Sequence, residues 1–390
     1  MADLTLYYVT NRNHIGKDRW SPEEYGSDFS ADGIENLRFG KVILQADERQ
    51  IKDYLNTATD DKGIGDGINL ASYLEKQFRA NGKIRVFIED LTGKTPRYGS
   101  QEMYEEVKAK MMASTDTMIY THGYAVSWCS AVASALSLQL ILSKRDEGIE
   151  NQKVLIILFT WPSDGRYVIA KDAKPDEIIN QQRHMSAYRS DRVEAEASGG
   201  ALARGILKLR DLFIEMRNKG EEPCNQSIHL LCHSMGNYVL QNALSKIANH
   251  TSTSALPSLF EHIFLCSADA DDTVLEPDQP MGILHQLASS VSIYYNREDK
   301  ALWLSDKLKG NPDRLGTNGA ARPAAIHKKI HQIDCTSIVQ EGILASEHSY
   351  YMYGKTNCDI RLSIANISHY DLEKRKRKQI GNFTNEWRLV

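Results

Sequence analysis

The chain has 390 residues, a net charge of −4 at pH 7, 42% hydrophobic and 25% charged residues, and a mean hydropathy of −0.44. A chain of this length and composition can bury a sizeable core without the help of metals or disulfides. The slightly negative charge excludes any general attraction to nucleic acid or to anionic membranes, so we expect no nucleic-acid partner.

The first hundred residues contain a few separate strand and helix patterns. We interpret residues 1–100 as an N-terminal extension packed on the core. Within this extension the hydrophobic patterns predict strands at 4–12, 41–45 and 83–90, a helix at 70–80, and a polar, turn-rich stretch at 13–40.

From about residue 100 the predicted strands and helices alternate, and we expect one core at 101–355. The residues at 153–160 are continuously apolar, which is typical of a strand buried on both faces of a parallel sheet. The alternation predicts an α/β fold with a doubly wound, mostly parallel sheet and helices on both faces. The predicted strands are 118–121, 153–160, 227–231, 262–266, 291–295 and 328–338, and the predicted helices are 103–113, 125–144, 201–216, 237–248, 281–289 and 300–308.

Two further segments stand apart from this alternation. The long charged stretch at 175–219 is interpreted as a helical insertion into the core. Residues 356–390 are interpreted as a C-terminal tail that is partly helical and basic. Its basic run at 374–378 is expected to form a solvated helix face rather than a binding patch.

A five-residue run lies between the strand at 227–231 and the helix at 237–248. It reads Cys232, His233, Ser234, Met235 and Gly236. A small-x-Ser-x-Gly run at a strand-to-helix junction is the signature of a nucleophile elbow, in which a sharp turn lifts the serine hydroxyl away from the sheet. The run therefore predicts a serine hydrolase with Ser234 as its nucleophile.

A serine nucleophile needs a base, and the base needs an orienting acid that precedes it in this kind of fold. His348 follows the last predicted strand in a loop-like segment and is our candidate base, with His369 as the weaker alternative. Asp299 and Asp269 each follow an apolar strand, at the sheet edge where open α/β proteins place their sites. We favour Asp299 as the acid and keep Asp269 as the alternative.

The tetrahedral intermediate of acyl transfer needs backbone N–H donors for its oxyanion. One donor is expected to be the amide of Met235, the residue after the nucleophile. Gly123 and Tyr124, in the loop after the strand at 118–121, are expected to supply the second donor, because glycine allows the backbone to approach a substrate closely.

Six segments of the chain follow one another in a recognisable order. They are 8–12, 122–124, 159–163, 233–237, 294–302 and 348–350. Together they resemble the bacterial α/β hydrolases grouped as domain of unknown function 900. The resemblance covers roughly residues 5–355, and one position departs from the usual pattern, because Cys232 stands where glycine is common. It implies the α/β-hydrolase fold, an esterase- or lipase-like activity without a cofactor, Ser234 as nucleophile, His348 as base, and Asp299 or Asp269 as acid.

The expected substrate is a small-molecule or lipid ester, and the expected reaction is that of a carboxylesterase. A lipase or phospholipase is the first alternative, since residues 165–200 are long enough for a lid, although this stretch is rich in charged residues after its apolar start. A non-catalytic binding or effector protein with this fold is the second. Protein partners are not indicated.

The chain shows no secretory signal at its start and no apolar stretch of the roughly 18 residues that a membrane span needs. Its six cysteines are scattered without a CxxC pair. We therefore expect a cytoplasmic protein with reduced thiols, no metal site and no transmembrane segment.

Overall fold

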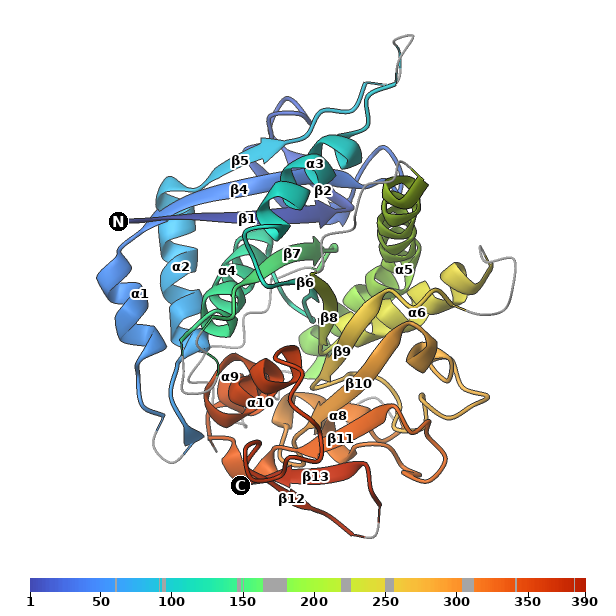
Figure 1. The fold of residues 1–390 in the computed structure, drawn as a ribbon. Helices are drawn as coiled ribbons and strands as arrows, with labels where there is room; N and C mark the ends of the chain where they lie inside the picture. Colours follow the sequence, from blue (N-terminus) through green and yellow to red (C-terminus); the bar gives the residue numbers. More distant parts are fainter. Residues whose placement is uncertain are drawn as a thin grey trace.

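A mixed sheet of eleven strands, counted over the described residues, runs through the molecule (Figure 1). The computed structural model describes residues 1–59, 62–90, 92, 96–145, 149, 151–163, 181–218, 226–249, 256–303, 312–340, 342–381 and 383–390. The strands of the sheet are β1 (Ala2–Thr10), β4 (Arg38–Ala46), β5 (Lys83–Val86), β6 (Asp116–Thr121), β7 (Val154–Thr160), β8 (Ser227–His233), β9 (Phe260–Cys266), β10 (Ala288–Tyr295), β11 (Ile330–Asp334), β12 (Arg377–Gln379) and β13 (Glu386–Leu389). A separate hairpin consists of β2 (Arg12–Ile15) and β3 (Glu24–Phe29).

The strand order is β12-β13-β11-β10-β9-β8-β6-β7-β1-β4-β5. All neighbours from β13 to β1 are parallel, and antiparallel pairs close the two edges, β12 with β13 on one side and β4 with β1 and β5 on the other. The carboxyl ends of the parallel strands therefore lie together along one side of the sheet, called its carboxyl edge below, where α/β proteins bind their ligands.

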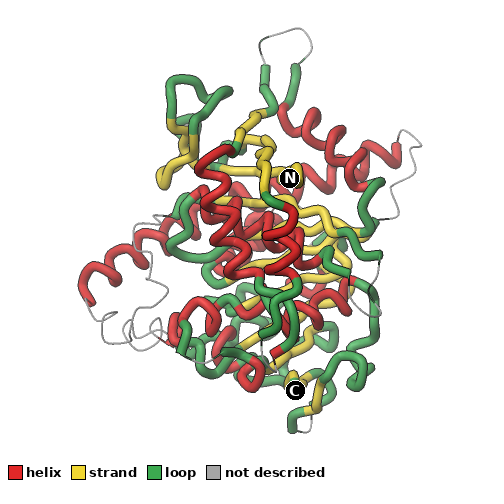
Figure 2. Tube along the Cα trace, turned by 90° about the vertical axis from the view of Figure 1, so that its left-hand side faces the viewer, coloured by secondary structure: helices red, strands yellow, loops and turns green. Residues whose placement is uncertain are grey.

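Helices cover both faces of this sheet, which is the predicted doubly wound arrangement. In Figure 2 the side of α2 faces the viewer, and helices lie in front of the strands. The helices are α1 (Glu48–Leu55), α2 (Gly67–Asn81), α3 (Gly99–Met111), α4 (Trp128–Leu142), α5 (Gln181–Asn218), α6 (Gly236–Asn249), α8 (Leu315–Asn318), α9 (Leu344–His348) and α10 (Gly354–Ile364). Short 3-10 turns lie between the later elements, at η3 (Leu284–Gln286), η4 (Thr336–Ile338) and η5 (Tyr350–Met352).

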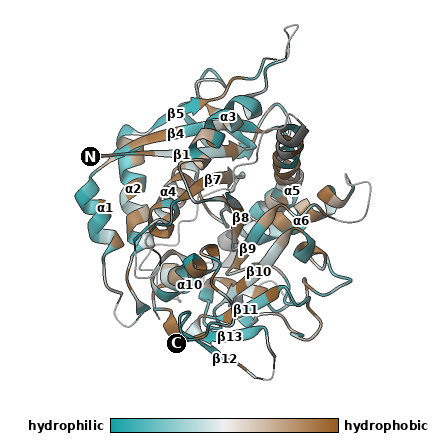
Figure 3. Ribbon diagram, in the orientation of Figure 1, coloured by the Kyte–Doolittle hydropathy of each residue, from teal (hydrophilic) through white to brown (hydrophobic). Residues whose placement is uncertain are grey.

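Each face of the sheet has its own hydrophobic core. The core under α3, α5 and α6 includes Met103, Leu202, Ile206 and Leu240. The core under α2, α4 and α10 includes Leu70, Leu74, Leu136 and Ile360. Side chains of the central strands enter both cores, so β7 is buried throughout and is apolar up to Phe159, whereas α1 is mostly hydrophilic (Figure 3).

The predicted α/β architecture is confirmed, with differences in individual elements. The expected helix at 281–289 is only the 3-10 turn η3, and β10 already begins at Ala288. The last core strand ends at Asp334 rather than at 338, because the Asp334 side chain accepts a hydrogen bond from the Thr336 amide at 2.9 Å and turns the chain. Residues 300–303 are helical, and the rest of the expected helix at 300–308 lies outside the described residues. The first part of the expected lid, 165–180, also lies outside them, and the remaining part, 181–200, belongs to α5.

The two predicted appendages contribute strands to the same sheet. β1, β4 and β5 belong to residues 1–100, and β12 and β13 belong to residues 356–390. The α10 helix supplies the helical part of the tail. The domain boundaries at 100 and 355 stay predictions.

The expected solvated helix face at 374–378 is wrong. Arg375 and Arg377 are 2% and 3% exposed and both hydrogen-bond the buried carboxylate of Asp359. The residues of the run lie in a turn and in the edge strand β12. A buried carboxylate needs such partners, because an unpaired buried charge is strongly destabilising.

Candidate active site

Ser234 lies in a sharp turn between β8 and α6. Its φ of 52° is left-handed, which is a strained conformation for a residue with a side chain. The Ser234 amide still donates to the Cys266 carbonyl of β9 at 3.0 Å, and the Asn237 side chain donates to the Ser234 carbonyl at 3.0 Å. These bonds hold the strained turn at the carboxyl edge of the sheet.

Two glycines allow this turn to pack closely against the loop after β6. A Cβ at Gly236 would lie 2.6 Å from the His122 carbonyl oxygen, and one at Gly123 would lie 2.7 Å from Ser234 Cβ and 3.2 Å from its Oγ. Both positions therefore exclude larger residues, and the Gly123 backbone lies directly beside the Ser234 side chain.

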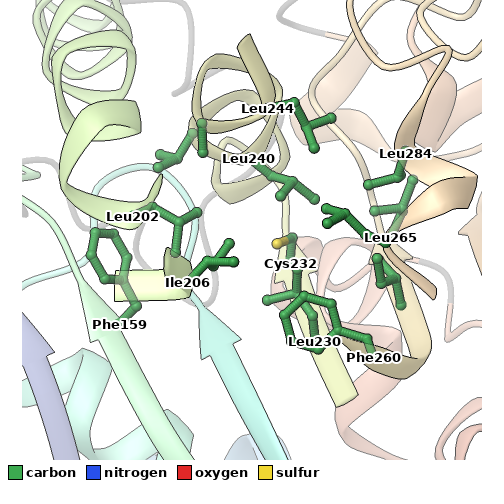
Figure 4. Close-up of a cluster of buried hydrophobic side chains, with 14 of the residues drawn as sticks. Phe159, Leu202, Ile206, Leu230, Cys232, Leu240, Leu244, Phe260, Leu265 and Leu284 are labelled. Carbon is green, nitrogen blue, oxygen red and sulfur yellow. The ribbon is translucent and has the colours of Figure 1, made fainter. Parts of the chain in front are cut away.

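Cys232, the departure from the usual elbow pattern, fits without disturbing the turn. Its side chain is fully buried among Leu230, Leu240 and Leu265 (Figure 4). Burial raises the pKa of the Cys232 thiol to about 12, so this thiol stays protonated near neutral pH.

His348 and Asp299 come together at the same edge of the sheet. His348 is the last residue of α9, and its Nδ1 donates to Asp299 Oδ2 at 2.8 Å. Asp299 is fully buried, and its Oδ1 also accepts from the Leu302 amide at 3.1 Å. Burial disfavours the imidazolium, but the attraction and hydrogen bond of Asp299 and the charge of Asp269 outweigh burial, so the pKa of His348 lies above its ordinary value of 6.5.

The backbone of His348 is held from two sides. His233 Nε2 donates to the His348 carbonyl oxygen at 3.1 Å, and Ser267 Oγ donates to the same oxygen at 2.7 Å. Because a carbonyl only accepts, this contact places the His233 proton on Nε2. Burial lowers the pKa of His233 well below its ordinary value, which keeps the ring neutral. The residue before the elbow serine thus fixes the backbone of His348.

Asp269 lies at this edge but has different partners. Its amide donates to the Ser234 carbonyl at 3.2 Å, whereas its carboxylate accepts from Tyr188 Oη at 2.7 Å and lies 3.2 Å from Arg314 Nε. Asp299, in contrast, hydrogen-bonds the imidazole of His348. Both candidate acids thus lie near His348, but only Asp299 hydrogen-bonds its ring.

The loop after β6 is held by a buried polar network. His122 Nδ1 hydrogen-bonds the Gly123 carbonyl at 2.9 Å, and burial lowers the pKa of His122 to about 3, so the ring is a neutral donor. The fully buried Arg12 donates to the Val126 carbonyl at 2.7 Å. The ring of Tyr124 lies 5.7 Å from that of Tyr188 in α5. This loop is therefore rigidly placed beside Ser234.

A match to a known family covers the part of the chain that contains these candidate residues. The family model described as an alpha/beta hydrolase of unknown function (DUF900) matches residues 100–358, about two thirds of the chain. The chain belongs to this family. No relative was found among the curated proteins. The DUF900 match includes the elbow, both candidate acids and His348, and it supports a hydrolase.

The alternative base His369 lies elsewhere in this DUF900 hydrolase. Its Nε2 hydrogen-bonds Ser290 Oγ at 3.0 Å, and its ring stacks on His331 at 3.8 Å. Ser290 is five residues before Tyr295, the carboxyl end of β10, which corresponds to roughly 16 Å along a strand. His369 therefore lies toward the amino ends of the parallel strands, whereas Ser234 lies at their carboxyl ends.

Within the described ranges, no group of three or more His, Cys, Asp or Glu side chains is arranged to hold a metal ion. The described helices of the DUF900 chain include none that is long and apolar enough to cross a membrane. The cysteines at 129, 232, 266, 335 and 358 are free thiols, and Cys224 lies outside the described residues.

Sequence reasoning missed several residues that shape this site. His233 and Ser267 hold the backbone of His348. His233 directly precedes Ser234, and Ser267 directly follows the strand at 260–266, and these positions could have indicated both residues. Tyr188 and Arg192 of α5 reach the site only through the tertiary fold. No local pattern distinguishes those two from the other residues of a long, charged helix.

Proposed function

We propose that this protein is a serine hydrolase that cleaves carboxylic esters, with Ser234 as nucleophile, His348 as base and Asp299 as acid. The observation that carries the proposal is the His348–Asp299 hydrogen bond of 2.8 Å at the same sheet edge as the left-handed Ser234. A neutral imidazole whose Nδ1–H donates to a carboxylate keeps a lone pair on Nε2, which is the form that a general base requires.

The proposed reaction has two halves. Ser234 Oγ attacks the acyl carbon while His348 Nε2 takes the hydroxyl proton, and the amide of Met235 with that of Gly123 or Tyr124 stabilises the oxyanion. His348 then passes the proton to the leaving alcohol oxygen, which leaves an acyl-enzyme on Ser234. Water, deprotonated by His348, attacks the acyl-enzyme, and the carboxylic acid leaves as Ser234 regains its proton.

In this proposal Asp299 takes precedence over Asp269, because Asp299 contacts the imidazole directly and Asp269 is paired with Arg314 and Tyr188. The proposed chemistry uses only side chains and backbone amides of this chain and needs no cofactor. A cytoplasmic location stays a prediction.

The proposal is tested by turnover of para-nitrophenyl esters of increasing acyl length. The wild type should hydrolyse at least one of them, and Ser234→Ala should lose essentially all of that turnover while keeping its melting temperature. Cys232→Ala is the matched control, since it changes the strand that leads into the same turn without removing the nucleophile, and it should remain active. Turnover by Ser234→Ala near that of the wild type would exclude the proposed nucleophile. A sharp rise in rate with micellar substrates would favour the lipase alternative over the carboxylesterase.

A further inference from the structure

The first part of α5 lies over the candidate active site. A helix of 38 residues is about 57 Å long, whereas a strand of seven residues such as β8 spans about 23 Å. The later part of α5 packs on the sheet and on α6 (Figures 1 and 4). Its earlier part reaches the carboxyl-edge loops, where Asp191 Oδ2 accepts from the Ala125 amide at 3.0 Å.

Tyr188 and Arg192 are four residues apart and so share one side of α5. Arg192 Nη1 donates to Tyr188 Oη at 3.2 Å, and Tyr188 Oη donates to Asp269, whose amide bonds the Ser234 carbonyl. These contacts form a continuous polar connection from Arg192 to Ser234.

The Arg192 guanidinium lies over an aromatic ring. Its Cζ lies 3.9 Å from the ring centroid of Tyr238, which is in the first turns of the elbow helix α6. A guanidinium over a ring is attracted by the ring's π face and can still use its N–H donors for a partner beside the ring. Tyr188 uses only one of these donors, Nη1.

The half-buried Arg192 has no ion-pair partner in the part of the chain that the structure describes. The nearby carboxylates are already engaged. Asp269 and Asp271 both pair with Arg314, and Asp191 accepts from Ser163 at 2.5 Å as well as from Ala125. Glu196, four residues after Arg192, accepts from Tyr238 Oη at 3.4 Å. Asp269 attracts the Arg192 charge without a direct ion pair, so the remaining N–H donors of Arg192 are available beside the site.

We infer that Arg192 binds an anionic group of the substrate, so that this hydrolase acts on esters that carry a carboxylate or phosphate on one side of the scissile bond. This inference rests on the proposed function. The guanidinium fork matches the planar geometry of a carboxylate and binds it through two N–H donors. Tyr188 positions the fork, and the Tyr238 ring holds its plane.

Two matched pairs of esters test the inference. The first pair places the charge in the acyl group (mono-para-nitrophenyl glutarate against para-nitrophenyl pentanoate). The second pair places it in the alcohol (para-carboxyphenyl against para-carbamoylphenyl butanoate). The measured quantity is the ratio of kcat/KM for the anionic ester to kcat/KM for its neutral partner.

Arg192→Gln should lower this ratio about 10- to 100-fold in at least one pair, because it removes a charge-assisted hydrogen bond. Arg192→Lys should give an intermediate ratio, because lysine keeps the charge but loses the fork. The matched control is Arg189→Gln, an exposed arginine on the same helix, which should leave the ratio unchanged. Melting temperatures and fluorophosphonate labelling of Ser234 show whether each variant is folded with an intact nucleophile.

An unchanged ratio in both pairs for Arg192→Gln, with esters turned over and Ser234 labelled, overturns the inference and leaves the proposed function standing. The absence of both turnover and labelling in the wild type refutes the proposed function, and the inference falls with it. The labelling result therefore separates the two failures.

Discussion

Replacing Asp299 by asparagine tests the proposed acid, and the structure dictates how the new amide orients. Asp299 Oδ1 accepts from the Leu302 amide at 3.1 Å, so the asparagine oxygen stays at this position. The asparagine NH2 group then takes the place of Oδ2, which lies 2.8 Å from His348 Nδ1. Asp299 Oδ1 also lies 3.0 Å from His348 Nδ1, but it already accepts from Leu302, and a proton on Nδ1 would face the new NH2 group across the shorter contact. We therefore expect the His348 proton to move to Nε2, so that the ring can no longer accept the Ser234 proton.

The wrong tautomer in a serine triad lowers kcat by about 10⁴-fold. This factor corresponds to a rise of about 5 kcal/mol in the activation free energy. Asp299→Asn should show this loss in steady-state ester hydrolysis, with KM changed far less than kcat. Asp269→Asn is the matched control, and it should lose much less activity, because Asp269 contacts Tyr188 and Arg314 rather than the imidazole.

The same variant has a pH signature. The pKa of His348 lies above 6.5 because Asp299 outweighs burial, and the base works only when neutral, so kcat/KM should fall as the pH drops through this raised pKa. Removing the Asp299 charge should lower the pKa of His348, so the remaining kcat/KM of the variant should fall only at lower pH than that of the wild type. A near-normal rate for Asp299→Asn together with an inactive Asp269→Asn would refute the reasoning and make Asp269 the acid.

Three further substitutions test other parts of the structure. Gly123→Ala places a methyl group 2.7 Å from the Cβ of the proposed nucleophile, so kcat should fall by about 10²-fold or more, without loss of the folded state in circular dichroism. His369→Ala should retain its ester turnover per folded molecule, and inactivation would mean that the alternative base had been dismissed wrongly. Asp359→Asn leaves Arg375 and Arg377 without their buried carboxylate and should lower the free energy of unfolding by about 3–5 kcal/mol in urea titrations. A decrease in the free energy of unfolding of less than about 1 kcal/mol would contradict a stabilising role for the buried pairs of Asp359 with these arginines.

The features that sequence reasoning predicted have local signals. The elbow requires a serine between small residues at a strand-to-helix junction, and the core strands are continuous apolar runs, so both are visible along the chain. Asp299 and His348 follow from their places after strands and from their chain order. These signals predict the α/β fold, which is confirmed, and the residues of the candidate site, whose roles stay predictions.

The features that sequence reasoning missed depend on contacts between distant segments. β12 is short and basic, and only its pairing with β13 and the burial of Arg377 against Asp359 make it part of the sheet. The contacts of Tyr188 and Arg192 depend on where a long helix crosses the sheet edge. The periodic pattern at 281–289 favoured a helix, but β10 pairs with β9 from Ala288 onward and ends it early.

The central claim is that Ser234 is an activated nucleophile, and covalent labelling tests it most directly. The pure protein is treated with a fluorophosphonate probe, and the adduct is mapped by mass spectrometry, with Ser234→Ala as the control. A stoichiometric adduct on Ser234, absent from the variant, is the expected result. A folded wild-type protein that carries no adduct, or an adduct on another residue, would contradict the proposed triad and favour a non-catalytic binding protein with this fold.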